Sequence, residues 1–316
     1  MSEPGIEAGT EPGSDRANDE IEVSVVLAVT GDDDDVSRPL QALRVAAAGA
    51  GCATEVIVVS HVDVQHVITP AETGDFRVIV ESAPAGALTP CLWAAGYRRA
   101  SGRIIAFTTT QCVVPSSWIE AIRAGLSGRD AGVGGPIGLA GDASATDWAV
   151  FHLRYSAFLS VPPNDGLARE IPGDNAAYLR ALLARHESTV RDGFWEVELH
   201  HLLRAEGGTL RLLPGMAVVF AHAPTVWSIA GQRFEHGKQS GWWRVRSGAR
   251  KRWQVVCAAP LVPLVLLARI MRAVRGTGRK IRIGAVPALL ILACAWAVGE
   301  AVGAVRRRAW SRCPAG

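Results

Sequence analysis

Two polar stretches of this sequence hold side chains that could do chemistry. The first is GRIIAFTTTQCVVPSSW (102–118), which predicts a buried strand over 104–107, a polar loop, and a helix opened by Ser116 and Ser117. Such a strand–loop–helix unit often presents a catalytic loop. Its three threonines and one glutamine offer neutral oxygens, which are weak ligands for a hard divalent cation compared with carboxylates.

The second stretch is FWEVELHHLLRAEGG (194–208), which predicts an amphipathic helix. Three leucines share one buried face of this helix: Leu199, Leu202 and Leu203. Glu196 and His200 fall one turn apart on another face. Taken alone, these two residues form a solvated pair four positions apart.

The elements that must position these groups alternate between strand and helix. Apolar runs predict strands at 23–29, 55–59, 76–82 and 103–107, and two helices at 40–51 and 92–102, the second with a glycine C-cap. Apolar strands alternating with helices indicate an α/β fold with a mostly parallel sheet flanked by helices on both faces. Ligands of such sheets bind at the carboxyl ends of the strands, so the loops after Val29, Val59 and Phe107 should face one crevice.

The second half of the chain predicts further elements beside polar groups. Asp174 or Asn175 can cap a helix from Ala176 to about Arg185. The segment MAVVFAH (216–222) predicts a closing strand that ends at a histidine, which at such a position is more often structural than functional.

Composition separates the two ends of the 316-residue chain, of which about half is apolar. Residues 1–21 are rich in Gly, Ser, Pro and acidic residues, which predicts a disordered acidic tail and no signal peptide, with the bulk of the chain on the synthesis side of any membrane. The aspartates at 32–35 predict a solvated turn and not a metal site, because adjacent carboxylates repel. Six widely spaced cysteines without a CxxC pair argue against a zinc site or a disulfide framework and predict mostly reduced thiols.

The C-terminal region, 246–316, predicts a basic membrane-associated segment. Hydrophobic stretches at about 255–271 and 283–305 are flanked by Arg and Lys, and Glu300 is the only carboxylate after Arg244. A two-span hairpin would place one basic cluster outside, so the first stretch is interpreted as interfacial or re-entrant and the second as spanning or deeply embedded. Core helices of a soluble domain are the alternative.

Residues 22–245 resemble the family 2 glycosyltransferases, whose catalytic domain has a GT-A-type (Rossmann-like) fold. VSVVLAVTGD is similar to the family's VSVVIPVYND, WAAGYRRASGRIIAFTTTQ to RNxGIxxAxGEIIAFLDAD, PGDNAAYLR to GANMAYRR, and FWEVELHHLL to EDVELGWRL. The acidic motifs depart from the family: Ser60 and His61 replace its DDGS carboxylates, and Thr109 and Gln111 occupy its DxD positions. Arg98, Arg99 and Arg103 are candidates for the missing positive charge.

The resemblance implies roles for particular residues. Glu196 falls on the general base of inverting members, which accepts the proton of the attacking acceptor hydroxyl. Donor and acceptor binding is expected from the following residues: Thr30, Ser60, His61, Thr109, Gln111, Gly173, Asp174, Asn175, His222, Gln232 and Arg233. Asp174 is equally well explained as a helix cap. No metal ligand is identified; a divalent cation such as Mg²⁺ or Mn²⁺ is the family's cofactor, but its usual carboxylates are absent.

The resulting hypothesis is a membrane-associated, inverting hexosyl- or glycosyltransferase. It would move a sugar from a nucleotide-diphosphate donor to a lipid-linked or polysaccharide acceptor, with the catalytic domain on the cytoplasmic side of the cell membrane. The alternative is an inactive glycosyltransferase-like scaffold subunit of a membrane assembly. A nucleic-acid partner is not expected, because the positive charge lies beside apolar segments and not on an aromatic-studded groove.

Overall fold

The structure is a computed structural model that describes residues 21–31, 34–64, 76–223, 225–276, 282–306 and 313. The expected acidic tail therefore lies, apart from Ile21, outside the described residues. The same holds for Asp32 and Asp33 of the aspartate run.

Within the described residues, eight strands form a large sheet in the order β3-β2-β1-β4-β9-β6-β10-β8. They are β1 (Val23–Ala28), β2 (Thr54–Ser60), β3 (Phe76–Ser82), β4 (Ile104–Thr109), β6 (Asp130–Gly134), β8 (Leu167–Ala168), β9 (Asn175–Leu179) and β10 (Thr209–Leu212). Strands β3, β2, β1 and β4 pair in parallel, as do β6 and β10, whereas β9 runs antiparallel between β4 and β6. The predicted α/β class with a mostly parallel sheet is confirmed.

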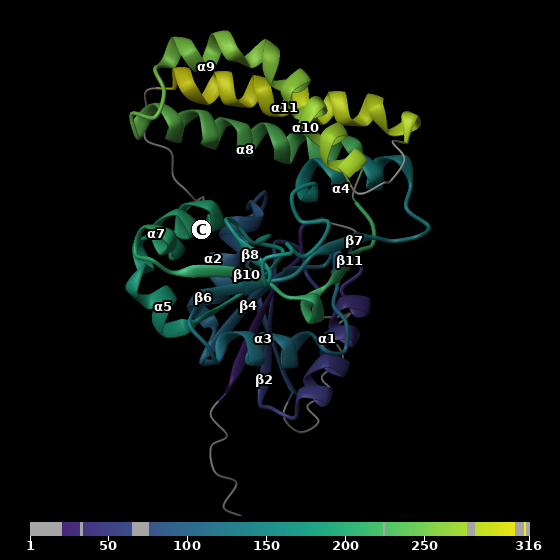
Figure 1. The fold of residues 1–316 in the computed structure, drawn as a ribbon, viewed down its shortest axis with the longest axis vertical. Coiled ribbons are helices and arrows are strands. Elements are labelled where there is room, and N and C mark those ends of the chain that lie inside the picture. The colour runs from purple at the N-terminus through teal and green to yellow at the C-terminus, as the bar shows by residue number, and fades with distance from the viewer. Residues whose placement is uncertain are drawn as a thin grey trace, which may run out of the picture.

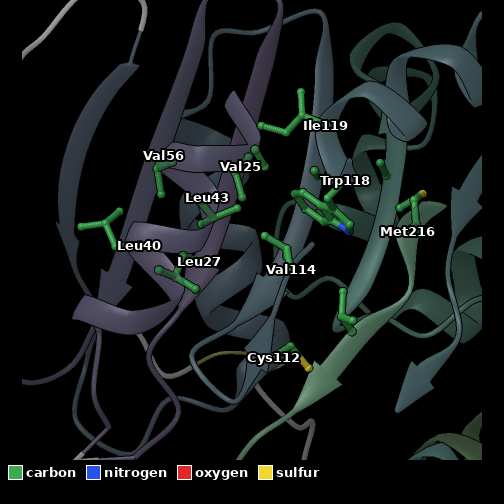
Figure 2. Close-up of a cluster of buried hydrophobic side chains, with 14 of the residues drawn as sticks. Val25, Leu27, Leu40, Leu43, Val56, Cys112, Val114, Trp118, Ile119 and Met216 are labelled. Carbon is green, nitrogen blue, oxygen red and sulfur yellow. The ribbon is translucent and has the colours of Figure 1, made fainter. Parts of the chain in front are cut away.

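Helices cover both faces of this sheet (Figure 1). One face packs on α1 (Ser37–Ala50) and α3 (Trp118–Leu126), and the other on α2 (Thr89–Arg99), α5 (Arg180–Arg185) and α7 (Glu196–Ala205). A short helix, α6 (Glu187–Val190), links the last two. Strand β1 serves both cores, because its successive side chains point to opposite faces: Val25 and Leu27 join one core and Val26 and Ala28 the other. Figure 2 shows the first core, where Val25 and Leu27 lie among side chains of α1 and α3.

A three-stranded sheet lies beside the end of β4. It consists of β5 (Cys112–Val113), β7 (Ile137–Leu139) and β11 (Val218–Phe220), the last being preceded by a 3₁₀ turn, η1 (Pro214–Met216). After β7 the chain enters α4 (Ala145–Tyr155), whose start is fixed by a capping box between Ser144 and Asp147. The C-terminal end of α4 contacts Asp174, the residue that precedes strand β9 of the large sheet.

Four further helices form a layer across one end of the sheet domain (Figure 1). They are α8 (Val226–Arg246), α9 (Arg252–Ala258), α10 (Val262–Gly276) and α11 (Val286–Val305), with 3₁₀ turns η2 (Ala259–Leu261) and η3 (Ile283–Ala285). Helix α8 lies next to the sheet domain and α9 lies farthest from it. The layer packs on α4, where Trp148 and Ala149 form a buried cluster with Ile270, Val274 and Leu289.

Glycines let α8 and α11 approach until their backbones touch. A methyl group on Gly237 or Gly241 of α8 would meet backbone atoms of α11, and one on Gly299 or Gly303 of α11 would meet backbone atoms of α8. The carboxylate of Glu300, buried between them, accepts a charge-assisted hydrogen bond from Arg244 of α8 at 2.9 Å. Pairing with α8 accounts for the lone carboxylate in an otherwise apolar helix.

Two segments of the described chain, Arg252–Gly276 and Ile283–Val305, are long and apolar enough to cross a membrane, by length and composition only. They coincide with the two predicted hydrophobic stretches. The predicted boundary between catalytic and membrane-associated regions, at 245–246, falls at the last residues of α8 and stays a prediction.

Two local predictions are wrong. The segment 176–185 is not one helix: Ala176 to Leu179 belong to strand β9, since their side chains fill both cores between β4 and β6, and the helix α5 begins only at Arg180. Gly102 is not the C-cap of α2, which ends at Arg99 with Ala100 extended; a Cβ at Gly102 would instead lie 2.7 Å from the Ser24 backbone nitrogen.

The prediction of mostly reduced thiols is confirmed, with one disulfide beside the free cysteines. Cys91 of α2 and Cys313 form a disulfide that spans 222 residues of the sequence, with Cα atoms 5.6 Å apart. The expectation of mostly reduced thiols holds for four others: Cys52 and Cys112, which are buried, and Cys257 and Cys294, which are exposed.

The α8–α11 contact leads to a stability test. Gly303→Ala places a methyl group on the backbone of Lys238, and we expect it to destabilise the protein by about 1 to 3 kcal/mol. The matched control is Gly231→Ala in the same helix pair, where no atom lies within 4 Å of the new methyl and helix propensity predicts a gain of about 1 kcal/mol. Thermal unfolding of the detergent-solubilised variants measures both. Equal effects would contradict the backbone contact.

Candidate functional site

The candidate site lies where the carboxyl end of β4 meets the amino end of β9. These strands are antiparallel with Thr108 opposite Asn175, so the loop after β4 and the segment before β9 lie side by side. The register brings together two stretches that are more than sixty residues apart in the sequence, Thr109–Gln111 and Gly173–Asn175. The predicted crevice at the carboxyl ends of the parallel strands is therefore bordered by both.

Arg154, the penultimate residue of α4, connects these stretches. Its guanidinium donates to Gln111 Oε1 at 2.8 Å and to both carboxylate oxygens of Asp174 at 2.9 Å. Tyr155 donates its hydroxyl to the same carboxylate at 2.6 Å. Burial by itself would lower the pKa of Arg154, but the charge of Asp174, its hydrogen bonds and the neighbouring Tyr155 and Cys112 together outweigh burial and raise that pKa further above its usual range. Asp174 is thus the anchor of a fixed cation and not a helix cap.

Sequence reasoning missed Arg154 and pointed to three other arginines. Arg98 donates to the Arg191 carbonyl, Arg99 pairs with Glu81, and Arg103 pairs with Glu22. All three lie at or before the amino end of β4, which is opposite to the crevice. The capping box at Ser144 marks the start of α4, but nothing in the local sequence marks where its last turn points.

Glu196 is the first residue of α7 and faces the segment before β9. A Cβ on Gly173 would lie 3.1 Å from the Glu196 carboxyl carbon, so glycine at this position leaves room for the carboxylate. Burial raises the pKa of Glu196 from 4.5 to about 7, and the nearby charges of Asp174 and Glu170 raise it further while Arg154 opposes them. Glu196 as a residue is partly exposed, although its carboxyl group lies in a buried environment.

His200 is not the partner of Glu196. Its ring is fully buried and lies between the Tyr178 hydroxyl, 2.7 Å from Nε2, and the Glu170 carboxylate, 2.6 Å from Nδ1. Arg204 reaches the other oxygen of Glu170 at 3.2 Å. Burial lowers the pKa of His200 despite the adjacent carboxylate. The solvated-pair interpretation is wrong, and the chain of contacts instead fixes α7 against β9.

Helix α8 supplies the opposite side of the site. Gln232 donates to the Thr30 carbonyl at 3.1 Å, which connects α8 to the loop after β1. The His236 ring packs edge-to-face on Trp195, the residue before Glu196, with centroids 5.6 Å apart. Arg233 stacks over Trp296 of α11, with its guanidinium carbon 4.2 Å from the ring centroid. Two of the predicted binding residues, Gln232 and Arg233, therefore lie at this side.

The charged forms of Arg233 and His236 on α8 are electrostatically disfavoured. Burial lowers the pKa of Arg233 to about 9, and the charge of Arg154 adds to this effect. Burial also lowers the pKa of His236 to about 3, with further contributions from Arg233 and Arg154. The three basic side chains are thus close enough to repel one another, and His236 is neutral at physiological pH.

The loop after β1 is organised by an aspartate. Asp34 accepts hydrogen bonds from the Thr30 backbone and hydroxyl, from the Gly31 backbone at 3.0 Å, and from the Thr110 hydroxyl. For Asp34 the predicted solvated turn is wrong, because the carboxylate joins the loop after β1 to the loop after β4. Thr30 and Thr110 are occupied by this role.

Several expected binding residues have structural partners. Asn175 accepts from the Trp118 indole at 2.8 Å and donates to the Met216 carbonyl at 2.7 Å, which ties β9 to α3 and η1. Ser60 is buried at the end of β2 and accepts from the Val62 backbone at 3.1 Å, with His61 directly after it. Thr109 is buried beside Cys112, whose pKa burial raises to about 12, so this thiol stays protonated.

His222 follows β11, and the chain beside it touches the site: the Ala221 backbone donates to the Gln111 carbonyl at 2.9 Å. The His222 side chain, however, is 59% exposed and lies 3.8 Å from Asp147 at the start of α4. Its contact is therefore with the capping box of α4 and not with Gln111, Arg154 or Asp174.

The sequence matches no protein-family model and no curated protein. Among solved structures, the fold is similar to that of TarS from S. aureus. Residues 1–349 of TarS in complex with UDP-GlcNAc match with 12% identity and a TM-score of 0.46, over 67% of this chain and 66% of that chain. Residues 1–349 alone match with 13% identity, a TM-score of 0.43 and coverages of 67% and 64%, and TarS with 14% identity, a TM-score of 0.43 and coverages of 68% and 39%. The present chain thus spans less than two thirds of these structures' lengths. Such low identities and TM-scores do not identify an activity.

The raised pKa of Glu196 predicts a cost in stability. The stability contributed by this carboxyl group is complete below its ordinary pKa of 4.5 and is lost as the pH rises through about 7. At about pH 8 we expect Glu196→Gln to raise the free energy of unfolding by roughly 1 to 2 kcal/mol over the wild type, seen as a higher unfolding temperature. Below about pH 4.5 the two proteins should differ little. Glu198→Gln controls for the loss of one charge in the first turn of α7. A gain that does not depend on pH would contradict the buried-carboxyl explanation.

Proposed function

We propose that this protein is a membrane-associated, inverting glycosyltransferase that transfers a sugar from a nucleotide-diphosphate donor to a lipid-linked or polysaccharide acceptor. The observation that carries this proposal is the placement of Glu196, with its raised pKa, beside the segment that holds Asp174, whose carboxylate binds Arg154 of α4. A carboxylate and a fixed cation at the carboxyl ends of the parallel strands supply the two functions that sugar transfer needs. These are a base for the acceptor hydroxyl and positive charge for the leaving diphosphate.

The pKa of Glu196 suits a general base. A base whose pKa is near the working pH combines a useful ionised fraction with enough basicity to accept a proton in the transition state. In the proposed reaction Glu196 takes the acceptor's hydroxyl proton while that oxygen forms a bond to the anomeric carbon. The bond from that carbon to the diphosphate oxygen breaks on the opposite face, and the nucleoside diphosphate leaves with the bonding electrons.

The neighbours of Glu196 support its position and not a second chemical role. Tyr178, His200 and Glu170 hold α7 against β9 through contacts of 2.6 to 2.7 Å, so the carboxylate at the helix start is fixed relative to Gly173. Trp195, held by its contact with His236, borders the carboxylate on the side of α8. We interpret the partial exposure of Glu196 between these elements as the approach for the acceptor.

The catalytic role predicts a specific loss. We expect Glu196→Gln to lower the transfer rate by about 10²- to 10⁴-fold while leaving the affinity for nucleoside diphosphates within a few-fold of wild type. The wild-type rate should rise with pH through an apparent pKa of about 7, because the base must be ionised. Release of nucleoside diphosphate from a panel of nucleotide sugars, in the presence of membrane lipid extract, measures both.

Glu198→Gln is the control for this experiment, since it removes a neighbouring carboxylate from the same helix. A wild-type protein that binds nucleoside diphosphates but releases none from any nucleotide sugar would favour the alternative, a glycosyltransferase-like scaffold subunit. The observation that favours the scaffold alternative is that Ser60, Asn175 and Asp34 form hydrogen bonds to other groups of the protein. A rate unaffected by Glu196→Gln would remove the proposed base.

Membrane association is the second part of the proposal and rests on the outer helices. Apolar side chains are widely exposed on α9, η2 and α10: Trp253 (63%), Leu261 (59%), Leu264 (61%) and Val265 (63%). A cavity of about 300 Å³ at the ends of α8, α9 and α11 is lined by Trp242, Arg246, Arg252 and Arg306 among others. Exposed apolar surface next to clustered arginines and tryptophan fits an anionic lipid surface.

The arrangement of α8 and α11 favours helices that lie at the membrane surface over helices that cross it. Helix α11 packs along α8 with backbone contact, and α8 carries Arg233, Glu235, Lys238, Arg244 and Arg246. If α11 crossed the bilayer in this arrangement, these charges would enter the hydrocarbon at a cost of several kcal/mol. We therefore propose that α9, α10 and the outer side of α11 lie in the interface, with the sheet domain on the cytoplasmic side.

A vesicle experiment tests this surface. We expect the double variant Leu264→Glu/Val265→Glu to bind vesicles of phosphatidylglycerol and phosphatidylcholine more than about tenfold less tightly than wild type, since it places two charges on the apolar face. Val45→Glu, on the exposed side of α1, is the matched control and should bind as wild type does. Sedimentation with vesicles measures the bound fraction. Equal binding by the double variant and the control would contradict the proposed surface.

A further inference from the structure

The residues at the DxD positions do not fit a divalent metal. Thr109 and Gln111 supply only neutral groups there, and Gln111 Oε1 accepts from Arg154. Of the nearby carboxylates, Asp174 is bound by Arg154 and Tyr155, and Asp34 by four hydrogen bonds from its own loop and Thr110. Nowhere in the described part of the chain do three or more His, Cys, Asp or Glu side chains form a group that could hold a metal ion.

We propose that the guanidinium of Arg154 takes the place of that metal, and that Arg154, Arg233 and His236 bind the donor's diphosphate without a divalent cation. This inference rests on the proposed glycosyltransferase function and deepens it. The chemistry is that of an arginine clamp: a planar, permanently charged group that presents several N–H donors to phosphate oxygens.

The geometry around Arg154 supports a fixed cation. Asp174 and Gln111 accept hydrogen bonds from both terminal nitrogens, which holds the guanidinium plane between β4 and β9. Its side chain still keeps 20% of its surface exposed, against 7% for Asp174, so a ligand can reach the arginine more readily than the carboxylate. Asp174 could bind a metal ion only if its ion pair with Arg154 were broken.

Three buried side-chain nitrogens around Arg154 point to a missing ligand. Gln111 Nε2, Arg233 Nε and His236 Nε2 are buried and have no hydrogen-bond partner among the described residues. A buried polar atom without a partner costs about 1 to 3 kcal/mol, and such atoms in native structures usually have a reason. Phosphate oxygens accept hydrogen bonds from all three kinds of donor, so one diphosphate would satisfy the set.

The charges lead to the same ligand class. Arg154 and Arg233 repel each other, and the pKa of both Arg233 and His236 is held low in the free protein. An anion placed among them would relieve this repulsion and raise both pKa values.

The test is calorimetric titration of the full, detergent-solubilised chain with UDP, GDP and dTDP, in EDTA and then in excess Mg²⁺ or Mn²⁺. We expect at least one nucleoside diphosphate to bind in EDTA with a dissociation constant within about twofold of that in metal, because the arginine clamp needs no bridging cation. Binding that requires metal would overturn the inference while leaving the proposed function standing. Failure of all three to bind under every condition would overturn both.

Variants locate the clamp. Arg233→Gln is expected to weaken the metal-free binding by about 10- to 100-fold, the typical loss for one charged hydrogen bond. Because Arg233 makes no ion pair in the described structure, this change leaves no buried carboxylate unpaired. Arg103→Gln removes the same charge at the opposite end of β4 and should bind as wild type does. Arg154→Lys keeps the charge opposite Asp174 but loses the planar donors, and should weaken binding by about tenfold or more.

Equal affinities for Arg233→Gln and Arg103→Gln would show that α8 does not contact the diphosphate and would overturn the inference. Circular dichroism and the thermal midpoint of each variant separate a folding defect from a binding defect. If Arg154→Lys unfolds, Arg233→Gln alone still decides the question.

Discussion

The antiparallel pairing of β9 with β4 is the constraint on which the candidate site depends. Because β9 runs against its neighbours, its first residues lie at the carboxyl ends of the parallel strands, where loops from β1, β2 and β4 also converge. Asp174 therefore meets Gln111, and the last turn of α4 brings Arg154 between them. Asn175 fixes this register through Trp118 and Met216, so the strand cannot slip without losing two buried hydrogen bonds.

The charges of the site depend on one another through this arrangement. Asp174 stabilises Arg154, Arg154 lowers the stability of a charged Arg233 and His236, and Asp174 opposes ionisation of Glu196. In the free protein this leaves a strained balance: a carboxyl group with a raised pKa and basic groups with lowered ones. Proteins commonly accept such costs at functional sites, where substrate binding offsets them. Binding of the proposed diphosphate would offset these costs.

Sequence reasoning identified the elements whose side chains show a regular period, whereas the catalytic role of Glu196 stays a prediction. Strands β1 to β4 and helix α7 were predictable because their apolar residues recur at the spacing of a strand or a helix, and the β3 limits agree fully with the prediction. Residues 176–179 were predicted to be helical because NAAYLRALLAR is rich in strong helix formers. They form a strand because they are buried between β4 and β6, and this burial outweighs the helix propensity. Arg154 could not be found, since its role arises from a contact across 20 residues that no local pattern records. For the same reason His200 was paired with Glu196 when its partners lie on β9 and before it.

Helix α8 has two sides with different surroundings. One side presents Gln232 and His236 to the sheet domain, and the other meets α11, through the stacking of Arg233 on Trp296 and through backbone contacts at Gly237 and Gly241. The close contact means that a shift of α11 along its axis must move α8, or break their packing. Membrane binding and donor binding would then be thermodynamically linked. If the bilayer favours one position of α8 and thereby changes the donor affinity by some factor, donor binding changes the membrane affinity by the same factor.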